Sequence, residues 1–547
     1  MAGWAALAIG LVGGLSRFWL CDDAFICFRY AKNLVNGNGL VFNVGERVEG
    51  FTNLLFTLGI AAAMKLGVRP EVFAPAAGLV SYLATLLLLL GEDRSADRAG
   101  GAAWPVGALV LAAHPDAHTF ATGGLETATF TFLAFLGYVL LTRGDPARTR
   151  AAAGAVLALA SLTRPDGILF VVVGLAYLTV WGRSRLLAFA GGFLVLWIPA
   201  TLLRVSYYGD FFPNTYYAKS GGLAWWSQGL TYVALFFERS WPLLLAFPLT
   251  ALVWLGRTEA PSDVKRRALL ALAMAGVYMS YIARVGGDFM YARMLVPILP
   301  FLATLFSIGV HTVLRPPLAR VAVLVVAVAG VAFTPCPVSA TRFESGITDE
   351  WDFYHRARPA WEVEERRRAL SLKRFFEGLP VGVAFFGGEA QLVYYAEPFL
   401  AVECTTGLTD RTIARQPLTE RRRVGHEKIA APAYVLSERR VHVAFDGDVA
   451  RYLQLSLQIT DARIDFDGVQ GRLLRWDPEV LAAWAARGAT FTDVPSRLDA
   501  YIREMDRFPD ERVVFEYEKF RRFYFDHVDD PIRRQAFERR VKGLRPQ

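Results

Sequence analysis

Residues 72–90 read VFAPAAGLVSYLATLLLLL, a stretch without a single charged side chain. About 17–20 apolar residues in a row are enough for a helix to cross a bilayer. Further apolar stretches lie at 127–142, 187–203, 241–256, 268–283, 294–314 and 320–334, with weaker ones at 2–16, 51–66, 102–113, 151–162 and 168–181. The sequence therefore predicts a polytopic α-helical membrane protein with about 11–12 membrane segments.

The composition changes sharply along the chain. Hydrophobic residues make up 54% and charged residues 20% of the 547 positions, and the mean hydropathy is +0.31. Residues 1–334 carry the whole formal charge of +8, whereas residues 335–547 hold 34 basic and 34 acidic residues. We therefore expect a transmembrane domain at 1–334 and a soluble α/β domain at 335–547. Because the excess charge lies in the apolar part, it does not indicate a nucleic-acid partner.

The excess basic residues gather in four loops that carry +2 each. These loops hold Arg143, Arg148 and Arg150 with Asp145; Arg183 and Arg185; Arg257, Lys265, Arg266 and Arg267 with Glu259 and Asp263; and Arg315 with Arg320. They alternate with loops 114–126, 163–167, 205–227 and 284–292. Since basic loops stay in the cytoplasm, the second set and the C-terminal domain are predicted outside.

The first hundred residues fit this alternation less well. Segment 2–16 lacks a basic region before it and a cleavage site after it, so we interpret it as a first membrane helix rather than a signal peptide. The short N-terminus leaves open that the natural chain starts earlier. Three apolar segments separate residues 22–23 from Glu126, and one of them, for which we favour 102–113, must be a half-span if both sites are outside.

The soluble part begins with a recognisable βαβ pattern. A charged helix at 360–377 precedes a strand at 381–386, a helix at 389–396 and a strand at 399–403. Gly387-Gly388 before the second helix could cradle a phosphate, although a tight turn is the favoured interpretation. The four cysteines form no metal-ligand pattern, and free thiols are favoured over a Cys21–Cys27 bridge. No metal site is therefore predicted, and a divalent cation is left open.

The densest polar cluster is the first outer loop, residues 20–50. Asp22 and Asp23 open it, and residues 23–35 repeat apolar positions at helical spacing, which predicts a helix along the membrane surface. One interpretation makes the two acids an N-cap. The other makes one of them a general base, because adjacent carboxylates at a membrane boundary repel and one then holds its proton more strongly.

Other polar groups recur at the predicted outer ends of the apolar segments and in the soluble part. Taken singly, each is a helix cap, a snorkelling side chain, a topology marker or a turn residue. Together they fall on one side of the membrane, where cations suit a phosphate and amides or hydroxyls suit a sugar. The candidate binding residues are Arg29, Asn33, Glu49, Thr52, Asn53, Glu126, Arg164, Asp166, Asn214, Tyr216, Lys219, Asp288, Arg293, Asp410, His426 and Lys428.

These motifs, in this order, resemble one family. The first-loop string Asp22-Asp-Ala-Phe-Ile…Phe-Arg-Tyr-Ala-Lys-Asn…Gly-Glu-Arg-Val-Glu-Gly…Thr-Asn53 is similar to that of polytopic GT-C glycosyltransferases, and within them to the terminal arabinofuranosyltransferases of mycobacterial cell walls (AftB type). Matching strings continue through Thr-Gly-Gly-Leu-Glu126, Thr-Arg-Pro-Asp-Gly167, Asn-Thr-Tyr-Tyr-Ala-Lys219, Gly-Gly-Asp-Phe-Met…Arg293, Gly-Leu-Thr-Asp410 and Gly-His-Glu-Lys428. The resemblance spans most of residues 20–430.

The resemblance implies a polyprenyl-phosphate sugar donor, a glycan acceptor and transfer on the outer face of a bacterial membrane. It also implies that Asp22 or Asp23 is the catalytic base; Arg164, Lys219 and Arg293 are our candidates to hold the leaving phosphate, and inversion is expected. Three rivals remain. They are a GT-C enzyme for another sugar with a protein or lipopolysaccharide acceptor, a non-enzymatic transporter of lipid-linked sugar, and a scaffold whose soluble part binds glycan.

Overall fold

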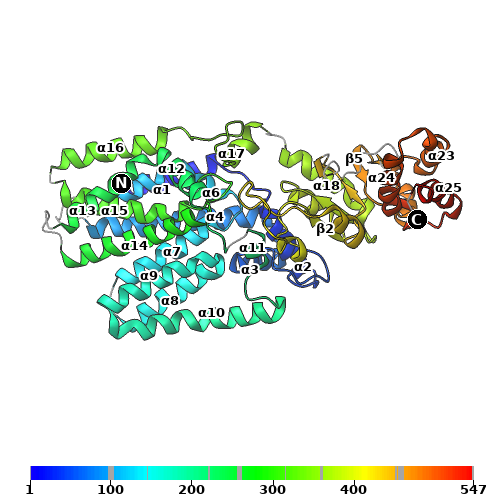
Figure 1. Ribbon diagram of the computed structural model, residues 1–547. Helices are drawn as coiled ribbons and strands as arrows, with labels where there is room; N and C mark the ends of the chain where they lie inside the picture. The colour runs from blue at the N-terminus through cyan, green and yellow to red at the C-terminus, as the bar shows by residue number, and fades with distance from the viewer. Residues whose placement is uncertain are drawn as a thin grey trace.

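The computed structural model describes residues 2–96, 104–143, 146–219, 222–255, 261–314, 316–357, 361–446, 448–449, 453 and 461–544. A long helical bundle occupies one end of the molecule, and a smaller part that contains the sheet occupies the other (Figure 1). Asp145, Arg257, Glu259 and Arg315, counted above in the basic loops, lie outside the described residues, as do the predicted segment ends at 102–103, 256 and 360.

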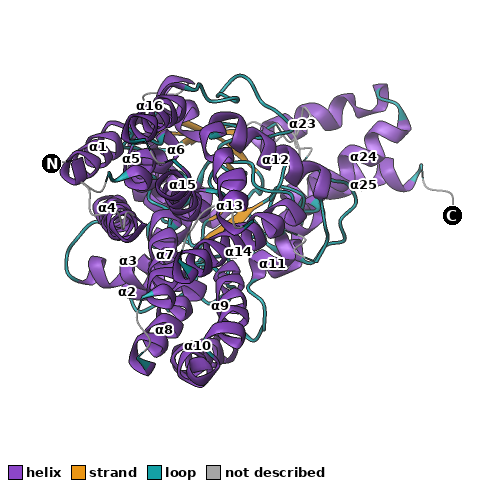
Figure 2. Cartoon of the chain, turned by 90° about the vertical axis from the view of Figure 1, so that its left-hand side faces the viewer, coloured by secondary structure: helices purple, strands orange, loops and turns teal. Residues whose placement is uncertain are grey.

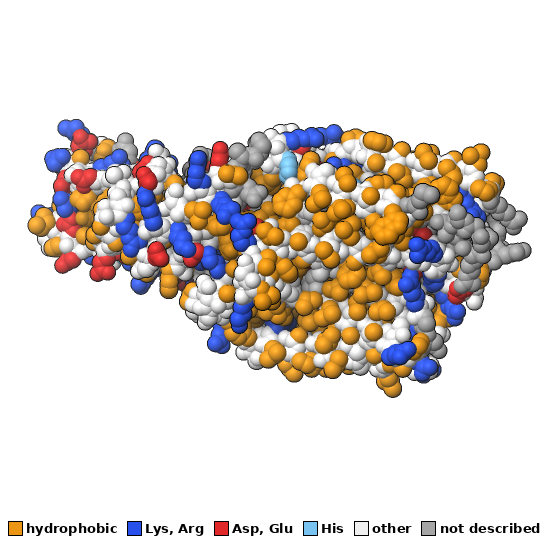
Figure 3. All heavy atoms as spheres, turned by 180° about the vertical axis from the view of Figure 1, so that it is seen from behind, with side chains coloured by type: hydrophobic (Ala, Val, Ile, Leu, Met, Phe, Trp, Pro, Cys, Tyr) orange, Lys and Arg blue, Asp and Glu red, His pale blue; other side chains and the backbone are white. Residues whose placement is uncertain are grey.

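The bundle follows the predicted apolar segments closely. Its helices, seen almost end-on in Figure 2, are α1 (Ala2–Ser16), α4 (Pro70–Ala96), α5 (Val106–Ala112), α6 (Pro115–Thr122), α7 (Thr127–Thr142), α8 (Ala147–Thr163), α9 (Ile168–Trp181), α10 (Leu186–Tyr208), α12 (Trp226–Arg239), α13 (Ala246–Trp254), α14 (Ser262–Val285), α15 (Leu299–Val313) and α16 (Pro317–Phe333). On the face shown in Figure 3, hydrophobic side chains cover most of the bundle, whereas charged side chains of both signs are spread over the smaller part. On α10, Leu187 and Leu203 are 84% and 70% exposed. Such a surface fits a lipid environment.

Fewer helical stretches of the described chain are long and apolar enough for a full membrane span than the 11–12 predicted segments. By length and composition, four helical stretches in the described residues can cross a membrane, namely Pro70–Ala96, Arg183–Tyr208, Ser262–Val285 and Val296–Val313. The bent pairs Pro115–Thr122 with Thr127–Thr142 and Trp226–Arg239 with Trp241–Trp254 raise this to at most six. Several predicted segments are shorter apolar helices of 10–17 residues instead, namely Ala2–Ser16, Leu54–Lys65, Pro165–Trp181 and Pro317–Phe333. The bundle is thus a polytopic membrane architecture, and the count of 11–12 stays a prediction.

Two of the first three apolar segments form short helices. Helix α3 (Leu54–Lys65) has 12 residues, about 18 Å at 1.5 Å per residue, which is too short for a hydrocarbon core about 30 Å thick. Helix α5 has 7 residues, and α6, which follows after Ala113 and His114, forms a bent pair with α7. Among these three segments, only α4 is long and apolar enough for a full span. The half-span at 102–113 stays a prediction.

Part of the basic excess is paired inside the bundle. Glu92, near the end of α4, accepts hydrogen bonds from Arg143 and Arg267, which belong to two of the predicted cytoplasmic loops. Arg150 donates to the carbonyls of Leu140 and Leu141 at the end of α7. These contacts connect the loops at the end of the bundle away from α2 (Ala24–Val35) and α3 (Figure 1).

The C-terminal part contains a six-stranded sheet in the order β2-β1-β3-β5-β4-β6. Strand β1 (Gly382–Phe385) pairs in parallel with β2 (Leu400–Glu403), and α19 (Ala390–Ala396) connects them, which confirms the predicted βαβ unit. Helix α18 (Trp361–Phe376) confirms the charged helix. The other elements are β3 (Val443–Ala444), parallel to β1; β4 (Arg463–Phe466), β5 (Val469–Leu473) and β6 (Thr490–Phe491), joined by antiparallel pairs; α17 (Glu350–Asp352), α20 (Arg411–Ala414), α22 (Pro478–Ala486), α23 (Val494–Glu504), α24 (Asp510–Phe520) and α25 (Pro531–Lys542).

The predicted first-loop helix is α2 (Ala24–Val35), and it is covered on both sides. Phe25 and Phe28 are 1% and 0% exposed, and both rings contact Tyr394 of α19. Helix α3 packs on α2 as well. Instead of lying on an open membrane surface, α2 is held between the bundle and the C-terminal part (Figure 1). This packing places the two aspartates at the junction of the two parts.

Candidate active site

The two adjacent aspartates have different surroundings. Asp22 is 2% exposed, and its two carboxylate oxygens accept hydrogen bonds from the backbone N–H groups of Ala390 and Gln391, each at 2.9 Å. These are the first two residues of α19, so Asp22 caps a helix of the C-terminal part. Burial raises the pKa of Asp22 to about 7, although the two N–H groups oppose that shift.

Asp23 is the accessible member of the pair. Its side chain is 36% exposed, and Oδ2 lies 3.7 Å from Nη1 of Arg293. It occupies the N-cap position of α2 but makes no side-chain cap hydrogen bond. The N-cap interpretation is therefore wrong for α2: one aspartate caps a different helix, and the other turns toward a cation.

Arg293 is fixed by the loop that follows α14. Gly286 and Gly287 have φ values of +95° and +71°, and Ala292, directly before the arginine, has a left-handed φ of +62°. Such backbone is costly for a residue with a Cβ and is often found at functional sites. Nε of Arg293 donates to Asp288 at 2.5 Å. Burial alone would lower the pKa of Arg293, but Asp288 and Asp23 raise it, so the guanidinium stays charged.

Arg164 and Glu126 form the next part of the site. Arg164 makes a bidentate ion pair with Asp166 at 3.1 and 2.8 Å, and its Nη1 lies 3.6 Å from Glu126. Asn53 donates to Glu126 at 2.9 Å, which ties the first loop to this cluster. Tyr278 of α14 donates to Asp166. These residues come from four separate loops or helices that the packing brings together.

Lys219 completes a group of three site cations with Arg164 and Arg293. Its side chain is accessible to solvent, and its ammonium has no hydrogen bond or ion pair to any residue that the structure describes. The protein around its ammonium and the nearby Arg293 lower the pKa of Lys219, while Asp288 and Asp23 oppose this. A positive charge with no fixed partner here is suited to an anionic ligand.

The C-terminal part contributes residues that the sequence motifs only partly revealed. His426 packs its ring edge-on against Phe289 with centroids 5.0 Å apart, and burial lowers its pKa. Glu350, which is absent from every motif, pairs with Arg423 at 3.2 Å. Burial raises the pKa of Glu350 to about 7, with smaller contributions from Asp23 and Asp288, although Arg423 opposes the shift. No local pattern marks Glu350, because its charged neighbours Asp23, Asp288 and Arg423 come from distant parts of the sequence.

The other predicted binding residues lie outside this cluster, and most of their polar groups bond to other parts of the protein. Arg29 donates to the carbonyls of Phe42, Val393 and Pro398, and Asn33 donates to those of Val41 and Phe42. Glu49 pairs with Arg204, and Asn214 donates to carbonyls of the 407–410 loop. Asp410 caps α20, Lys428 donates to the carbonyl of Gln416, Tyr216 stacks on Phe212, and Thr52 is half-buried. Their roles in ligand binding stay predictions.

Gly387-Gly388 forms the turn into α19, with Gly388 at a φ of +97°. The N-terminus of α19 does hold an anion, and that anion is the Asp22 carboxylate of the same chain. This location is the one that the sequence suggested for a phosphate. The tight-turn interpretation is thus confirmed by the backbone geometry, and the anion-binding property of the helix end is used internally.

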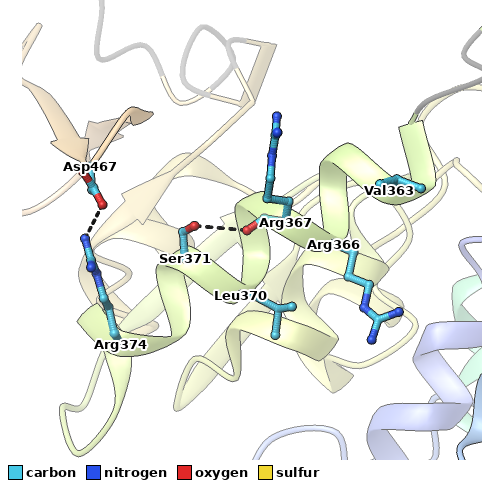
Figure 4. A pocket seen from close by; sticks show the side chains of 7 residues that line it. All are labelled: Val363, Arg366, Arg367, Leu370, Ser371, Arg374 and Asp467. Atoms are coloured by element: carbon cyan, nitrogen blue, oxygen red, sulfur yellow. Dashed lines mark hydrogen bonds and ion pairs between the residues drawn. The ribbon is translucent and has the colours of Figure 1, made fainter.

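A separate shallow hollow of about 490 Å³ lies on α18, away from these residues. Arg366 and Arg367 extend from the helix at different angles, and Arg374 reaches Asp467 at 2.5 Å (Figure 4). None of the predicted site residues lines this hollow. Within the described parts of the chain, no group of three or more His, Cys, Asp or Glu side chains is placed to hold a metal ion.

Comparison with known proteins places this geometry in context. No family model matches the chain. Over 344 residues, the chain is 33% identical to the terminal beta-(1->2)-arabinofuranosyltransferase of Mycobacterium tuberculosis. The aligned region covers 56% of this chain and 54% of that protein. The predicted resemblance to the terminal arabinofuranosyltransferases is confirmed. The protein of the same name from Corynebacterium glutamicum is 30% identical over 352 residues, covering 56% and 50%. The chain thus spans about half the length of the curated relatives it matches.

Solved structures agree on the fold. ArnT from Cupriavidus metallidurans bound to undecaprenyl phosphate superposes with a TM-score of 0.58 at 15% sequence identity, covering 86% of this chain and 96% of that chain. The apo state of the same protein gives a TM-score of 0.54. The chain therefore has the GT-C fold that the resemblance to the terminal arabinofuranosyltransferases implied.

Proposed function

We propose that this chain is a membrane glycosyltransferase that moves a sugar, arabinofuranose, from a polyprenyl phosphate to a hydroxyl group of a glycan. The observation that carries the proposal is the accessible Asp23 carboxylate near Arg293 and Lys219, with Arg164 close to both of these cations. The names of the curated relatives support the sugar, and the lipid phosphate bound to ArnT supports the class of donor.

The reaction needs one base and positive charge around the leaving group. Asp23 takes the proton from the acceptor hydroxyl, and that oxygen attacks the anomeric carbon of the donor sugar. The bond between the anomeric carbon and the phosphate oxygen breaks, and the electron pair leaves with the polyprenyl phosphate. Positively charged donors placed where this charge develops lower the barrier. Attack on the face opposite the leaving group inverts the anomeric centre.

Asp22 has a different part in this proposal. Its carboxylate is buried and its two oxygens accept from the N–H groups of Ala390 and Gln391, so it does not face an acceptor hydroxyl. We assign it to hold α19 against the first loop and thereby to position Asp23. Arg293 stays in place through Asp288 whether or not Asp23 is ionised.

The donor is tested by presenting purified protein in detergent or nanodiscs with labelled polyprenyl phosphates that carry different sugars. We expect transfer from the arabinofuranosyl donor, with hexosyl donors at least about tenfold slower, because a site that hydrogen-bonds one sugar rejects analogues that leave its polar groups unpaired. Product linkage analysis reports inversion. Transfer from a hexosyl donor without transfer of arabinofuranose would move the proposal to another sugar.

The site and the C-terminal part are proposed to lie outside the cytoplasm of a bacterial cell membrane, because the basic loops lie at the opposite end of the bundle. Cysteine labelling tests this in a Cys336→Ala background, since Cys21, Cys27 and Cys404 are buried. A membrane-impermeant maleimide should label Ala500→Cys of α23 in intact cells, and Ser184→Cys between α9 and α10 only after lysis. The reverse pattern would contradict the orientation.

A further inference from the structure

A second cavity lies where the first loop meets the C-terminal part. Its volume is about 610 Å³, within the range of ligand sites. One side is the end of α2 with residues 36–44, and the other is the end of α19 with the turn at 376–380. None of the three site cations and neither aspartate lines it. We call it the acceptor groove.

The charges that line the groove nearly balance. Three basic side chains, Arg29, Lys32 and Lys373, face two acidic ones, Glu377 and Glu397. Glu397 accepts hydrogen bonds from both Lys32 and Lys373, the second at 2.7 Å, and Lys32 also lies over the ring of Tyr394, 4.7 Å from its centroid. Because the lining has little excess charge of either sign and its lysines are already paired, the groove favours an uncharged ligand.

What remains available in the groove is a set of amides and apolar faces. Asn36 and Asn38 are exposed, and neither side chain makes a hydrogen bond to a described residue. Phe399 and Val44, on opposite sides, are 53% and 40% exposed. An amide offers both a donor and an acceptor to a hydroxyl, and an aromatic ring packs against the C–H face of a sugar. The composition is that of a site for a neutral carbohydrate.

The position of the groove relates it to the aspartate pair. Helix α2 begins at Asp23 and ends at the groove after 12 residues, and α19 begins at the Asp22 carboxylate and ends at the groove after 7 residues. At 1.5 Å per residue these helices measure about 18 Å and 10 Å. A glycan of several residues could therefore have its terminal hydroxyl at Asp23 while a more distant part lies in the groove.

We propose that the acceptor groove binds the glycan acceptor at residues distant from the reacting hydroxyl, and so selects long acceptors over short ones. The inference rests on the proposed function for the identity of the acceptor. It goes beyond that function, because it assigns a second carbohydrate site to residues that no motif singled out, notably Asn36, Asn38 and Phe399.

The test compares acceptors of two lengths with the triple variant Asn36→Ala, Asn38→Ala and Phe399→Ala in the full chain. For an arabinofuranosyl hexasaccharide, we expect the KM to rise about tenfold with kcat nearly unchanged, the loss typical of a few binding contacts. For the disaccharide, KM and kcat should stay as in the wild type. Gln470→Ala with Phe515→Ala is the matched control, since these exposed side chains of β5 and α24 lie away from the groove.

A binding measurement keeps the result independent of catalysis. In the Asp23→Asn background, calorimetric titration with the hexasaccharide should show binding that the triple variant weakens about tenfold. If hexasaccharide binds in this way but no donor supports transfer, the groove stands and the proposed function fails. If transfer occurs and the triple variant has an unchanged KM for the hexasaccharide, or loses both acceptors equally, the groove is not an acceptor site.

Discussion

Asp23→Asn is expected to lower kcat for sugar transfer by about 10²–10⁴-fold, the usual contribution of a general base. Asparagine has nearly the same shape but cannot take the proton of the acceptor hydroxyl. Arg293 keeps its bond to Asp288, so the cation beside the site should not move. Initial rates with saturating donor and acceptor give kcat, and an unchanged melting temperature shows that the fold is intact.

Asp22→Asn provides the contrast within the same pair. We expect kcat to stay within about tenfold of the wild type and the melting temperature to fall, because an amide oxygen replaces a carboxylate that accepts two buried N–H groups, each of which costs about 1–3 kcal/mol if left unpaired. If Asp22→Asn abolished transfer in a folded protein while Asp23→Asn remained active, the assignment of the two roles would be reversed.

The raised pKa of Asp22 adds a dependence on pH to this contrast. Burial raises that pKa from 3.8 to about 7, so the folded chain holds the proton more strongly than the unfolded chain does. The contribution of Asp22 to stability therefore decreases as the pH rises from about 4 to about 7. Melting temperatures at the two ends of this range should differ less in Asp22→Asn than in the wild type.

Lys219→Met should weaken binding of polyprenyl phosphate and lower kcat by about 10²-fold, since removing one preorganised donor at a developing oxyanion has an effect of this size. Lys219 is the site cation to test. Arg164 is paired with Asp166 and Arg293 with Asp288, whereas the ammonium of Lys219 has no partner in the described structure. Methionine keeps most of the length and apolar stem but removes the charge. Equilibrium binding of undecaprenyl phosphate and single-turnover rates are the measurements.

Two further variants check that the effect of Lys219→Met comes from charge at this position. Lys219→Arg restores a cation and should recover part of the activity. Lys542→Met removes an exposed charge of α25 that is paired with Glu538, and it should leave both measurements unchanged. Lipid-phosphate affinity that is the same in Lys219→Met and the wild type would exclude Lys219 from phosphate binding.

Several features of the fold were predictable because they are local. A run of apolar residues forms a helix in lipid wherever it occurs, so α7, α9 and α1 coincide with predicted segments to the residue. The βαβ unit followed from a strand, two glycines and a helix in sequence. The half-span among the first segments did not follow in this way, because the apolar segments at 51–66 and 102–113 both form short helices, α3 and α5.

The candidate site was predictable in its membership but not in its roles. Arg164, Lys219 and Arg293 were grouped because each lies at the same predicted end of the bundle; the structure brings the three cations near one another, with Lys219 and Arg293 close to Asp23. Arg29 belongs to the same motif, yet its guanidinium donates to three backbone carbonyls. A motif identifies residues that occur together in the sequence. It does not distinguish a side chain that contacts a ligand from one that stabilises the loop.

By itself, the sequence determined that the chain is a membrane protein and predicted which loops share a side. It also located an acidic pair at the start of the first loop. These features depend on hydrophobicity, charge and spacing, which are local properties of the sequence. Only the tertiary structure decided which acid is accessible. Ala390 lies 368 positions from Asp22, and the N-terminus of α19 that binds the Asp22 carboxylate reaches it only when the C-terminal part packs on the first loop. That contact buries the Asp22 carboxylate and leaves Asp23 facing the cations. It cannot be predicted from the local sequence.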